Sequence, residues 1–152
     1  MIIYLKKKVS VSFSIVKIMK KLSTYVFLVL LFFGNIFAKS IESDDELNQL
    51  FDQLKKINDA SIAFKVEIKI WNIWSTHPTE EKLTTSLKIG SELMSKGELN
   101  SAYKIFSTII QSEPDWAEGW NKRATVLYLM GKYPDSLNDI DEVLKRESRH
   151  FG

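Results

Sequence analysis

The stretch Trp120–Leu144, WNKRATVLYLMGKYPDSLNDIDEVL, decides the fold, because it matches the residues 34 positions before it. When the sequence is shifted by 34 residues, Gly90 falls on Ala124 and Gly97 falls on Gly131. The other matched pairs are Ser86 with Trp120, Ile89 with Arg123, Leu93 with Leu127, Ala102 with Ser136, Phe106 with Ile140, and Ile109 with Val143. A period of this length indicates an array of supersecondary units that bury their apolar faces against one another.

The small residues in the repeated unit predict two helices joined by a tight turn. Gly90 and Ala124 would allow two helices to approach closely, and Gly97 and Gly131 suit the left-handed backbone conformation that ends a helix. Pro134 lies where the first residues of a helix tolerate a missing amide. We therefore expect an all-α fold from residue 80 onward.

These residues resemble the tetratricopeptide repeat family, whose unit of 34 residues contains two helices. The residues that carry the resemblance, and that we expect to pack the repeats together, are Gly90, Leu93, Ala102, Phe106, Pro114, Trp120, Ala124, Leu127 and Gly131. The first unit departs from the family pattern at Ser86, which replaces the aromatic residue, and the second departs at Ser136 and Ser148. The resemblance implies an α-solenoid of antiparallel helix pairs.

The two repeats are expected at residues 79–116 and 117–150, and residues 151–152 begin a third frame. If the chain ends at Gly152, part of the last helix has no later helix to cover it. The apolar residues concerned are Leu137, Ile140, Val143 and Leu144. A truncated chain, an oligomer and a terminal unit that is tolerated as it stands are the three alternatives.

Residues 39–78 are expected to form a helix pair that either caps the array or stacks on it as a degenerate repeat. Residues 64–70 also alternate between apolar and charged side chains, as a strand would. The length of the segment and a capping residue at Asp59 favour a helix. Trp71 and Trp74 would then lie on or beside its buried stripe, where a core role is expected.

Residues 1–38 have the layout of a secretory signal. The segment MKKLSTYVFLVLLFFGNIFAKS, which begins at Met19, has a basic start and an apolar run, and the small residue Ala38 suits cleavage after it. Translation from Met19 is an alternative start. The predicted location is the periplasm or the exterior, and the alternative is an uncleaved anchor in the inner membrane, although such an anchor needs about 20 apolar residues.

Charge is divided unevenly along the chain. Six of the 21 basic residues and none of the 19 acidic residues precede Lys39, so 15 basic and 19 acidic residues remain in the body. This acidic balance argues against nucleic acid as a partner. The chain has no cysteine, which excludes disulfides and thiol chemistry.

The sequence contains no recognisable catalytic, cofactor or metal site. His77 lies near Glu80 and Glu81, but a histidine beside a helix start is expected to be structural rather than a metal ligand. The acidic residues of the last helix are expected on a solvated face and are Asp135, Asp139 and Glu142. We therefore expect neither an enzyme nor a cofactor.

The resemblance implies that the first helix of each repeat lines a concave groove in which a peptide lies. The candidate groove residues are Thr84, Leu87, Lys88, Ser91, Asn121, Lys122, Thr125 and Tyr128. Lys88 and Lys122 occupy equivalent positions and could together meet a carboxylate, the alternative being two ordinary exposed lysines. For Arg123 we expect a packed aliphatic stem and a charge that reaches water, and Asp115 could cap the next helix.

The function predicted from the sequence is a non-catalytic, exported module that binds a protein or a peptide. The alternative is a membrane-anchored scaffold or assembly subunit that keeps its N-terminal apolar segment. A more remote alternative is an enzyme that uses only acidic residues and lysine in the groove. An oligomer is compatible with each of these functions.

Overall fold

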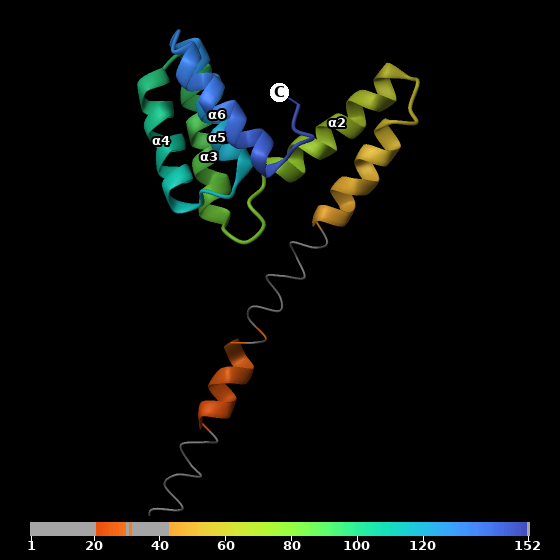
Figure 1. The fold of residues 1–152 in the computed structure, drawn as a ribbon, viewed down its shortest axis with the longest axis vertical. Coiled ribbons are helices and arrows are strands. Elements are labelled where there is room, and N and C mark those ends of the chain that lie inside the picture. Colours follow the sequence, from red (N-terminus) through yellow and green to blue (C-terminus); the bar gives the residue numbers. More distant parts are fainter. Residues whose placement is uncertain (1–20, 30, 32–42, 152) are drawn as a thin grey trace, which may run out of the picture. The chain divides into compact units, whose positions relative to one another are not determined.

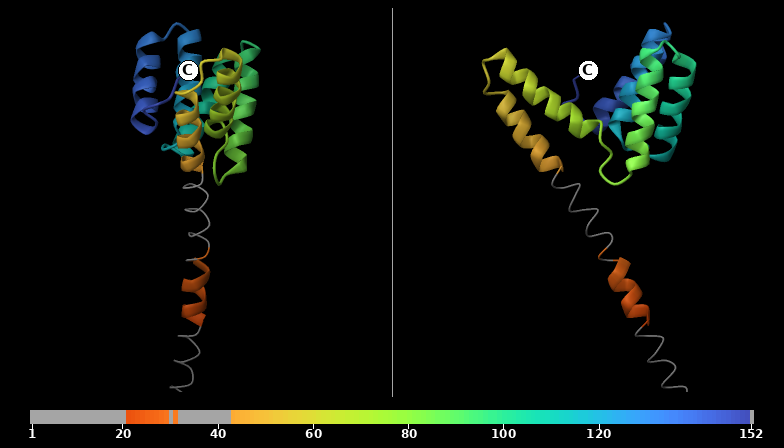
Figure 2. Two further views of the ribbon diagram at one scale, coloured as in Figure 1. Left: turned by 90° about the vertical axis from the view of Figure 1, so that its right-hand side faces the viewer. Right: turned by 180° about the vertical axis from the view of Figure 1, so that it is seen from behind.

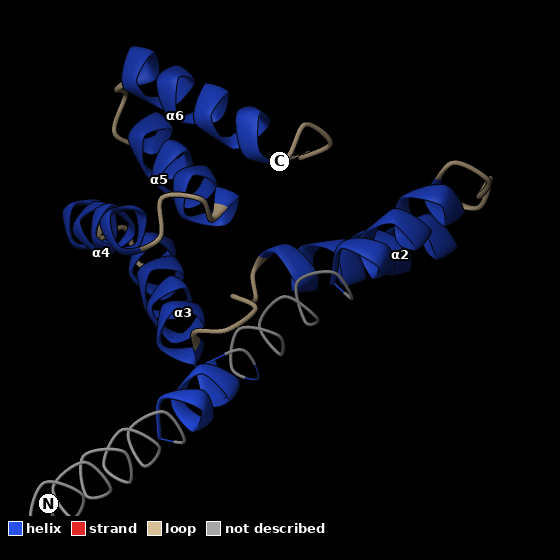
Figure 3. Ribbon diagram, turned by 60° about the horizontal axis from the view of Figure 1, so that its bottom comes forward, coloured by secondary structure: helices blue, strands red, loops and turns tan. Residues whose placement is uncertain are grey.

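The computed structural model describes residues 21–29, 31 and 43–151. These residues belong to two compact units, Met1–Glu42 and Ser43–Gly152. All regular secondary structure in the described residues is helical, as Figure 3 shows. The prediction of an all-α fold is therefore confirmed for this part of the chain.

In the first unit, residues 21–29 are helical, and the large apolar side chains among them are exposed. Among the described residues, no helix is both long and apolar enough to cross a membrane. The alternative start at Met19 and the predicted cleavage position after Ala38 lie outside the described residues.

The second unit begins with two antiparallel helices, residues 43–54 and α2 (Ala60–Trp74), which the right-hand view of Figure 2 shows side by side. The carboxylate of Asp59 caps α2 by accepting hydrogen bonds from the backbone amides of Ser61 (2.8 Å) and Ile62 (3.2 Å). The core that the two helices share contains Leu47, Leu50, Val66, Ile70 and Trp74.

Burial along α2 decides between the two secondary structures considered for this segment. Val66 and Ile70, four residues apart, are buried, whereas Phe64 and Ile68 are exposed. A strand would have placed all four side chains on one face, because its side chains alternate with a period of two. The helix prediction is therefore correct, and Trp74 lies in the core as expected.

Four further helices form two antiparallel pairs, visible together in Figure 1. The first pair is α3 (Glu81–Ser95) with α4 (Leu99–Ser112), and the second is α5 (Ala117–Leu129) with α6 (Tyr133–Arg146). In addition, α5 packs against α4, so the pairs form a continuous stack. Each predicted repeat range, 79–116 and 117–150, contains one of these helix pairs.

The turns inside the two pairs have the same backbone hydrogen bonds. Gly97 and Gly131 have positive φ angles of 78° and 73°. The amide that follows each glycine donates to a carbonyl five residues earlier, from Glu98 to Leu93 and from Lys132 to Leu127, both at 2.9 Å. This is the glycine-terminated helix end that the sequence predicted.

The contact between Gly90 and Phe106 sets how closely α3 and α4 approach each other in the core. A Cβ atom on Gly90 would lie 2.6 Å from Phe106 Cε1, so only glycine allows α3 and α4 to approach this closely. Around this contact, the buried side chains are Leu87, Ala102, Phe106, Ile109 and Val126. The last of these comes from α5, which therefore completes the core of the first pair.

In the second pair, Ser136 occupies the position of Ala102. Its hydroxyl is buried and donates to the carbonyl of Ala124 at 2.8 Å. Because this polar group has a hydrogen-bond partner, a serine is tolerated where the first repeat has alanine.

Two expectations about the second pair were wrong, and a third was right. Asp115 does not cap α5, whose N-cap residue is Trp116 and has no side-chain capping bond. Four apolar residues of the last helix were expected to remain uncovered. Val143 is instead buried within the helix pair, while Leu137, Ile140 and Leu144 are exposed. Pro134 does lie in the first turn of α6.

Candidate functional site

The predicted groove residues of the first repeat have different environments. Thr84 Oγ1 accepts the backbone amide of His77 at 2.8 Å, and the hydroxyl of Ser91 donates to a carbonyl of its own helix. Lys88 is exposed. Leu87 is only 3% exposed and packs in the repeat core. Its assignment to a groove was wrong, because it lies three residues before Gly90 and shares the helix face that packs on the neighbouring helices.

The predicted groove residues of the second repeat lie in two places. Asn121, Thr125 and Tyr128 line a depression of about 230 Å³, together with Ala124, Ser136 and Ile140. By contrast, Lys122 turns to the carboxylate of Glu118, with Nζ 3.0 Å from Oε1. Lys122 is therefore not the free cation that the pairing with Lys88 required.

Glu118 is the centre of a buried polar cluster on α5. Its side chain is completely buried, and Oε2 accepts a hydrogen bond from Asn121 Nδ2 at 3.1 Å. The same oxygen lies 3.1 Å from His150 Nε2, so α5 is joined to the segment that follows α6. The sequence prediction placed Asn121 and Lys122 among the groove residues but not Glu118, the group to which both are bound.

Electrostatics keep this carboxylate ionised. Burial alone raises the pKa of Glu118, but the hydrogen bond from His150 and the charge of Lys122 together outweigh burial, so its pKa lies below the ordinary value of 4.5. A buried anion held in this way is a strong acceptor for a hydrogen-bond donor brought to it.

Aromatic rings form one wall of the cluster. The imidazole of His150 stacks on Trp74, with the ring centroids 4.1 Å apart and the planes 14° apart. Trp71 lies edge-on to both His150 and Phe151, and the ammonium of Lys122 is 5.5 Å from the Trp71 ring. Both tryptophans therefore have a second contact surface in addition to the core of the helix pair.

Residues 147–151 form a non-helical segment between the 43–54 helix, α2 and α5. Phe151 packs on the rings of Phe51 and Trp74. Arg149 is held by Glu147 and donates to Asn48 Oδ1 at 2.7 Å. The segment is thus anchored by the contact of His150 with Glu118, the hydrogen bond from Arg149 to Asn48 and the ring contacts of His150 and Phe151. We call the surface formed by Phe51, Trp71, Trp74, Glu118 and Lys122 the tail seat.

A second polar cluster joins the two helices of the second repeat. Arg123 donates two hydrogen bonds to Asp139, at 2.7 and 2.8 Å, and Asp139 is buried. The hydrogen bonds that Arg123 donates to Asp139 raise the pKa of its guanidinium. One expectation is corrected here, because Asp139 is buried and does not lie on a solvated face. The Arg123 side chain is 19% exposed, and its charge is paired with this carboxylate.

Trp120 lies beside this ion pair and is only half-buried, less than a packing residue between helices was expected to be. Its ring lies 5.1 Å from the Arg123 guanidinium and 4.8 Å from that of Arg146. The indole N–H donates to the carbonyl of Pro114 at 2.9 Å. The ring is therefore stacked by cations instead of being enclosed by apolar side chains.

His77 is buried in the loop before α3 and has a structural role. Its Nδ1 accepts the backbone amides of Glu80 (2.9 Å) and Thr79 (3.4 Å), and its ring packs edge-on against Trp116. Within the part of the chain that the structure describes, no group of three or more potential ligands could hold a metal ion.

The signals for the two missed clusters differ. Arg123 lies 34 positions after Ile89, and Asp139 lies 34 positions after Ile105. Two apolar residues of the first repeat are therefore replaced together by residues of opposite charge in the second. That joint change could have revealed the ion pair. The cluster around Glu118 has no such signal, because it depends on His150, which is 32 positions away.

Comparison with known proteins adds one relative. Over 106 residues, or 70% of the chain, the sequence is 33% identical to a TPR repeat-containing protein of Rhizobium etli. The chain spans about half of that relative, since the match covers 52% of it. No family model and no solved structure matches. The 34-residue period, the two stacked helix pairs with their glycine turns and this relative together place the chain in the tetratricopeptide repeat family.

Proposed function

We propose that the chain is a non-catalytic repeat module that binds a segment of another protein in the tail seat. The observation that carries the proposal is the presence of a non-helical segment of the same chain, residues 147–151, on this surface. Proteins with tetratricopeptide repeats generally bind protein partners. The tail seat supports the same mode of binding here, because its contacts to residues 147–151 are contacts that a separate peptide could make.

The tail seat favours a particular kind of peptide. Glu118 offers a buried carboxylate oxygen, so the peptide must bring a hydrogen-bond donor to it, as His150 does. Beside it, Phe51, Trp71 and Trp74 contact the ring of Phe151. We therefore propose a partner segment that presents a donor side chain followed by an aromatic residue.

The binding proposal can be tested with a peptide of known sequence. In the variant His150→Ala/Phe151→Ala the chain's own side chains leave the tail seat. The peptide acetyl-Arg-His-Phe-Gly-amide, which has the sequence of residues 149–152, should then bind, and the indole N–H signals of Trp71 and Trp74 should shift in NMR spectra. The native chain should bind it less well, since its tail seat is occupied.

Two further variants serve as controls for the experiment. Adding Glu118→Gln to the double variant should abolish binding of the peptide, whereas adding Lys88→Ala, an exposed change outside the tail seat, should leave binding intact. Equal responses of all variants, or no shift at either indole, would contradict the proposal.

Export to the periplasm is the second part of the proposal. The basic and apolar segment from Met19 to Ala38 supports it. N-terminal sequencing of the protein from its native host provides the test, with a mature start at Lys39 as the expected result. An intact N-terminus on a membrane-bound protein would favour the alternative, a tethered scaffold that uses the apolar run Leu22–Phe37.

A further inference from the structure

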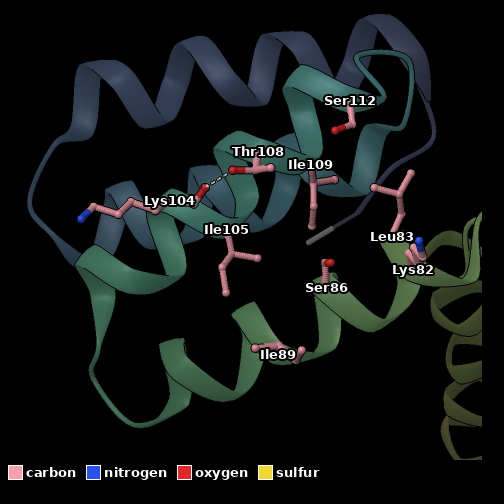
Figure 4. A pocket seen from close by; sticks show the side chains of 9 residues that line it. All are labelled: Lys82, Leu83, Ser86, Ile89, Lys104, Ile105, Thr108, Ile109 and Ser112. Atoms are coloured by element: carbon pink, nitrogen blue, oxygen red, sulfur yellow. Dashed lines mark hydrogen bonds between the residues drawn. The ribbon is translucent and has the colours of Figure 1, made fainter.

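A pocket of about 350 Å³ lies between α3 and α4 of the first repeat (Figure 4). Its apolar wall consists of Leu83, Ile89, Ile105 and Ile109, and Figure 4 shows Ile105 and Ile109 of α4 above the side of α3 that carries Ser86. The remaining lining residues are Lys82, Ser86, Lys104, Thr108 and Ser112. The pocket is separate from the tail seat and shares no residue with it.

The second repeat shows what fills the equivalent space. A shift of 34 residues takes Ser86 to Trp120, Ile89 to Arg123 and Ser112 to Arg146. There both guanidinium groups lie over the Trp120 ring, at 5.1 and 4.8 Å from its centroid. The backbones of the two repeats have the same turns, so the pocket is the space that an indole ring occupies one repeat later.

Its size and lining suit an aromatic ring. An apolar cavity of about 150 Å³ is enough to bind benzene, and small-molecule pockets begin at roughly 300 Å³. Ser86 is half-buried, and among the described residues its hydroxyl makes no hydrogen bond, so it is available to an indole N–H. The ring would displace water from four aliphatic side chains.

The charges around the pocket have one sign. Figure 4 places Lys82 at one end of the pocket and Lys104 at the other. No acidic residue lines the pocket, and neither lysine forms an ion pair within the described part of the chain. A carboxylate next to the bound ring would therefore meet uncompensated positive charge.

We propose that this pocket binds an aromatic side chain, with tryptophan as the best fit, that carries a neighbouring carboxylate on a partner protein. The inference goes beyond the proposed function, because it assigns a second site with a different ligand chemistry. The tail seat selects a donor for a buried carboxylate, whereas this pocket selects an anion beside a ring.

The test uses N-acetyltryptophan, which has both an indole and a carboxylate, and the neutral N-acetyltryptophanamide as its matched probe. Methyl NMR spectra of the chain should show shifts at Ile89, Ile105 and Ile109 on addition of N-acetyltryptophan. The amide should bind about two- to five-fold more weakly, the range expected for an exposed ion pair. The variant Lys104→Glu should remove this difference between the probes, because Lys104 is exposed and acts through its charge.

Ser86→Trp should abolish binding of both probes by filling the pocket with the chain's own indole. Ser86→Leu, which reduces the pocket without adding a ring, should weaken both, and circular dichroism checks that each variant is folded. Unchanged isoleucine signals with both probes at millimolar concentration would overturn the proposal. So would shifts of those signals with protein concentration alone, which would assign the pocket to a second copy of the chain. Since residues of the tail seat are not changed, failure here is distinguishable from failure of the proposed function.

Discussion

Gly90→Ala tests the contact on which the packing of the repeats depends. The new methyl group would lie 2.6 and 2.8 Å from Cε1 and Cζ of Phe106, and 3.2 Å from Cγ2 of Ile105. Phe106 is fully buried in the repeat core, so other side chains surround its ring. Either α3 and α4 must separate or the ring must leave its preferred rotamer.

The magnitude follows from two opposing effects. Overpacking of a core costs about 1–3 kcal/mol. Replacing glycine by alanine inside a helix recovers about 0.5–1 kcal/mol. The middle of these two ranges leaves a net loss of roughly 1 kcal/mol of unfolding free energy, which urea denaturation would detect as a lower midpoint with an unchanged slope.

Two comparisons establish that the loss comes from the Phe106 ring. Phe106→Leu, which shortens the side chain, should reduce the additional cost of Gly90→Ala in a double-mutant cycle. Gly97→Ala provides the matched control, because no atom lies within 4 Å of the new Cβ and the cost comes from the φ angle of 78° alone. That cost should not change with Phe106→Leu. A Gly90→Ala variant as stable as the native chain, or an equal cost in both Phe106 backgrounds, would refute the reasoning.

Three further results are expected. Asp139→Ala should destabilise the chain by about 2–4 kcal/mol, because it leaves Arg123 largely buried without its partner, and the double change Arg123→Met/Asp139→Leu should cost less in the same urea assay. The lowered pKa of Glu118 stabilises the native chain fully above the pKa of the unfolded state, and this contribution is lost as the pH falls through the pKa of the folded state. Acidification below pH 4.5 should therefore cost the Glu118→Gln variant less stability than it costs the native chain. Burial outweighs the charges of nearby glutamates and lowers the pKa of His77 below 6.5. The stability of the native chain should therefore fall as the pH drops from 6.5 towards the pKa of the folded state. His77→Gln should remove that part of the pH dependence in thermal unfolding curves.

The repeat period predicted the parts of the fold that depend on local sequence. Gly97 and Gly131 end their helices with the same hydrogen bonds because the backbone conformation at such a turn is a property of the residue itself. Gly90 and Phe106 were both named as packing residues, and they do meet. The helix at α2 was predicted from its length and from Asp59, which is also a local feature.

The tail seat could not be predicted in this way, because it brings together distant residues. Glu118 is bound by His150, which stacks on Trp74, and both of these residues lie more than 30 positions from Glu118 along the chain. The family resemblance suggested Asn121 and Lys122 as free groove side chains. Both are bound to Glu118, a contact that the spacings of three and four on a helix allow but do not require.

The two repeats differ at three positions whose side chains contact one another in the second repeat, so the differences are coupled. At equivalent positions, Ser86 and Ile89 of the first repeat are replaced by Trp120 and Arg123 in the second, and Ile105 is replaced by Asp139. In the second repeat the Arg123 guanidinium lies over the Trp120 ring and is neutralised by Asp139, so removing the ring leaves a cavity and removing either charged group leaves the other unpaired. The first repeat has neither charged residue at these positions, and it contains the pocket. A single change at Ser86 should therefore fill the pocket without requiring an ion pair, since the walls around it are apolar and Lys82 and Lys104 are already in water.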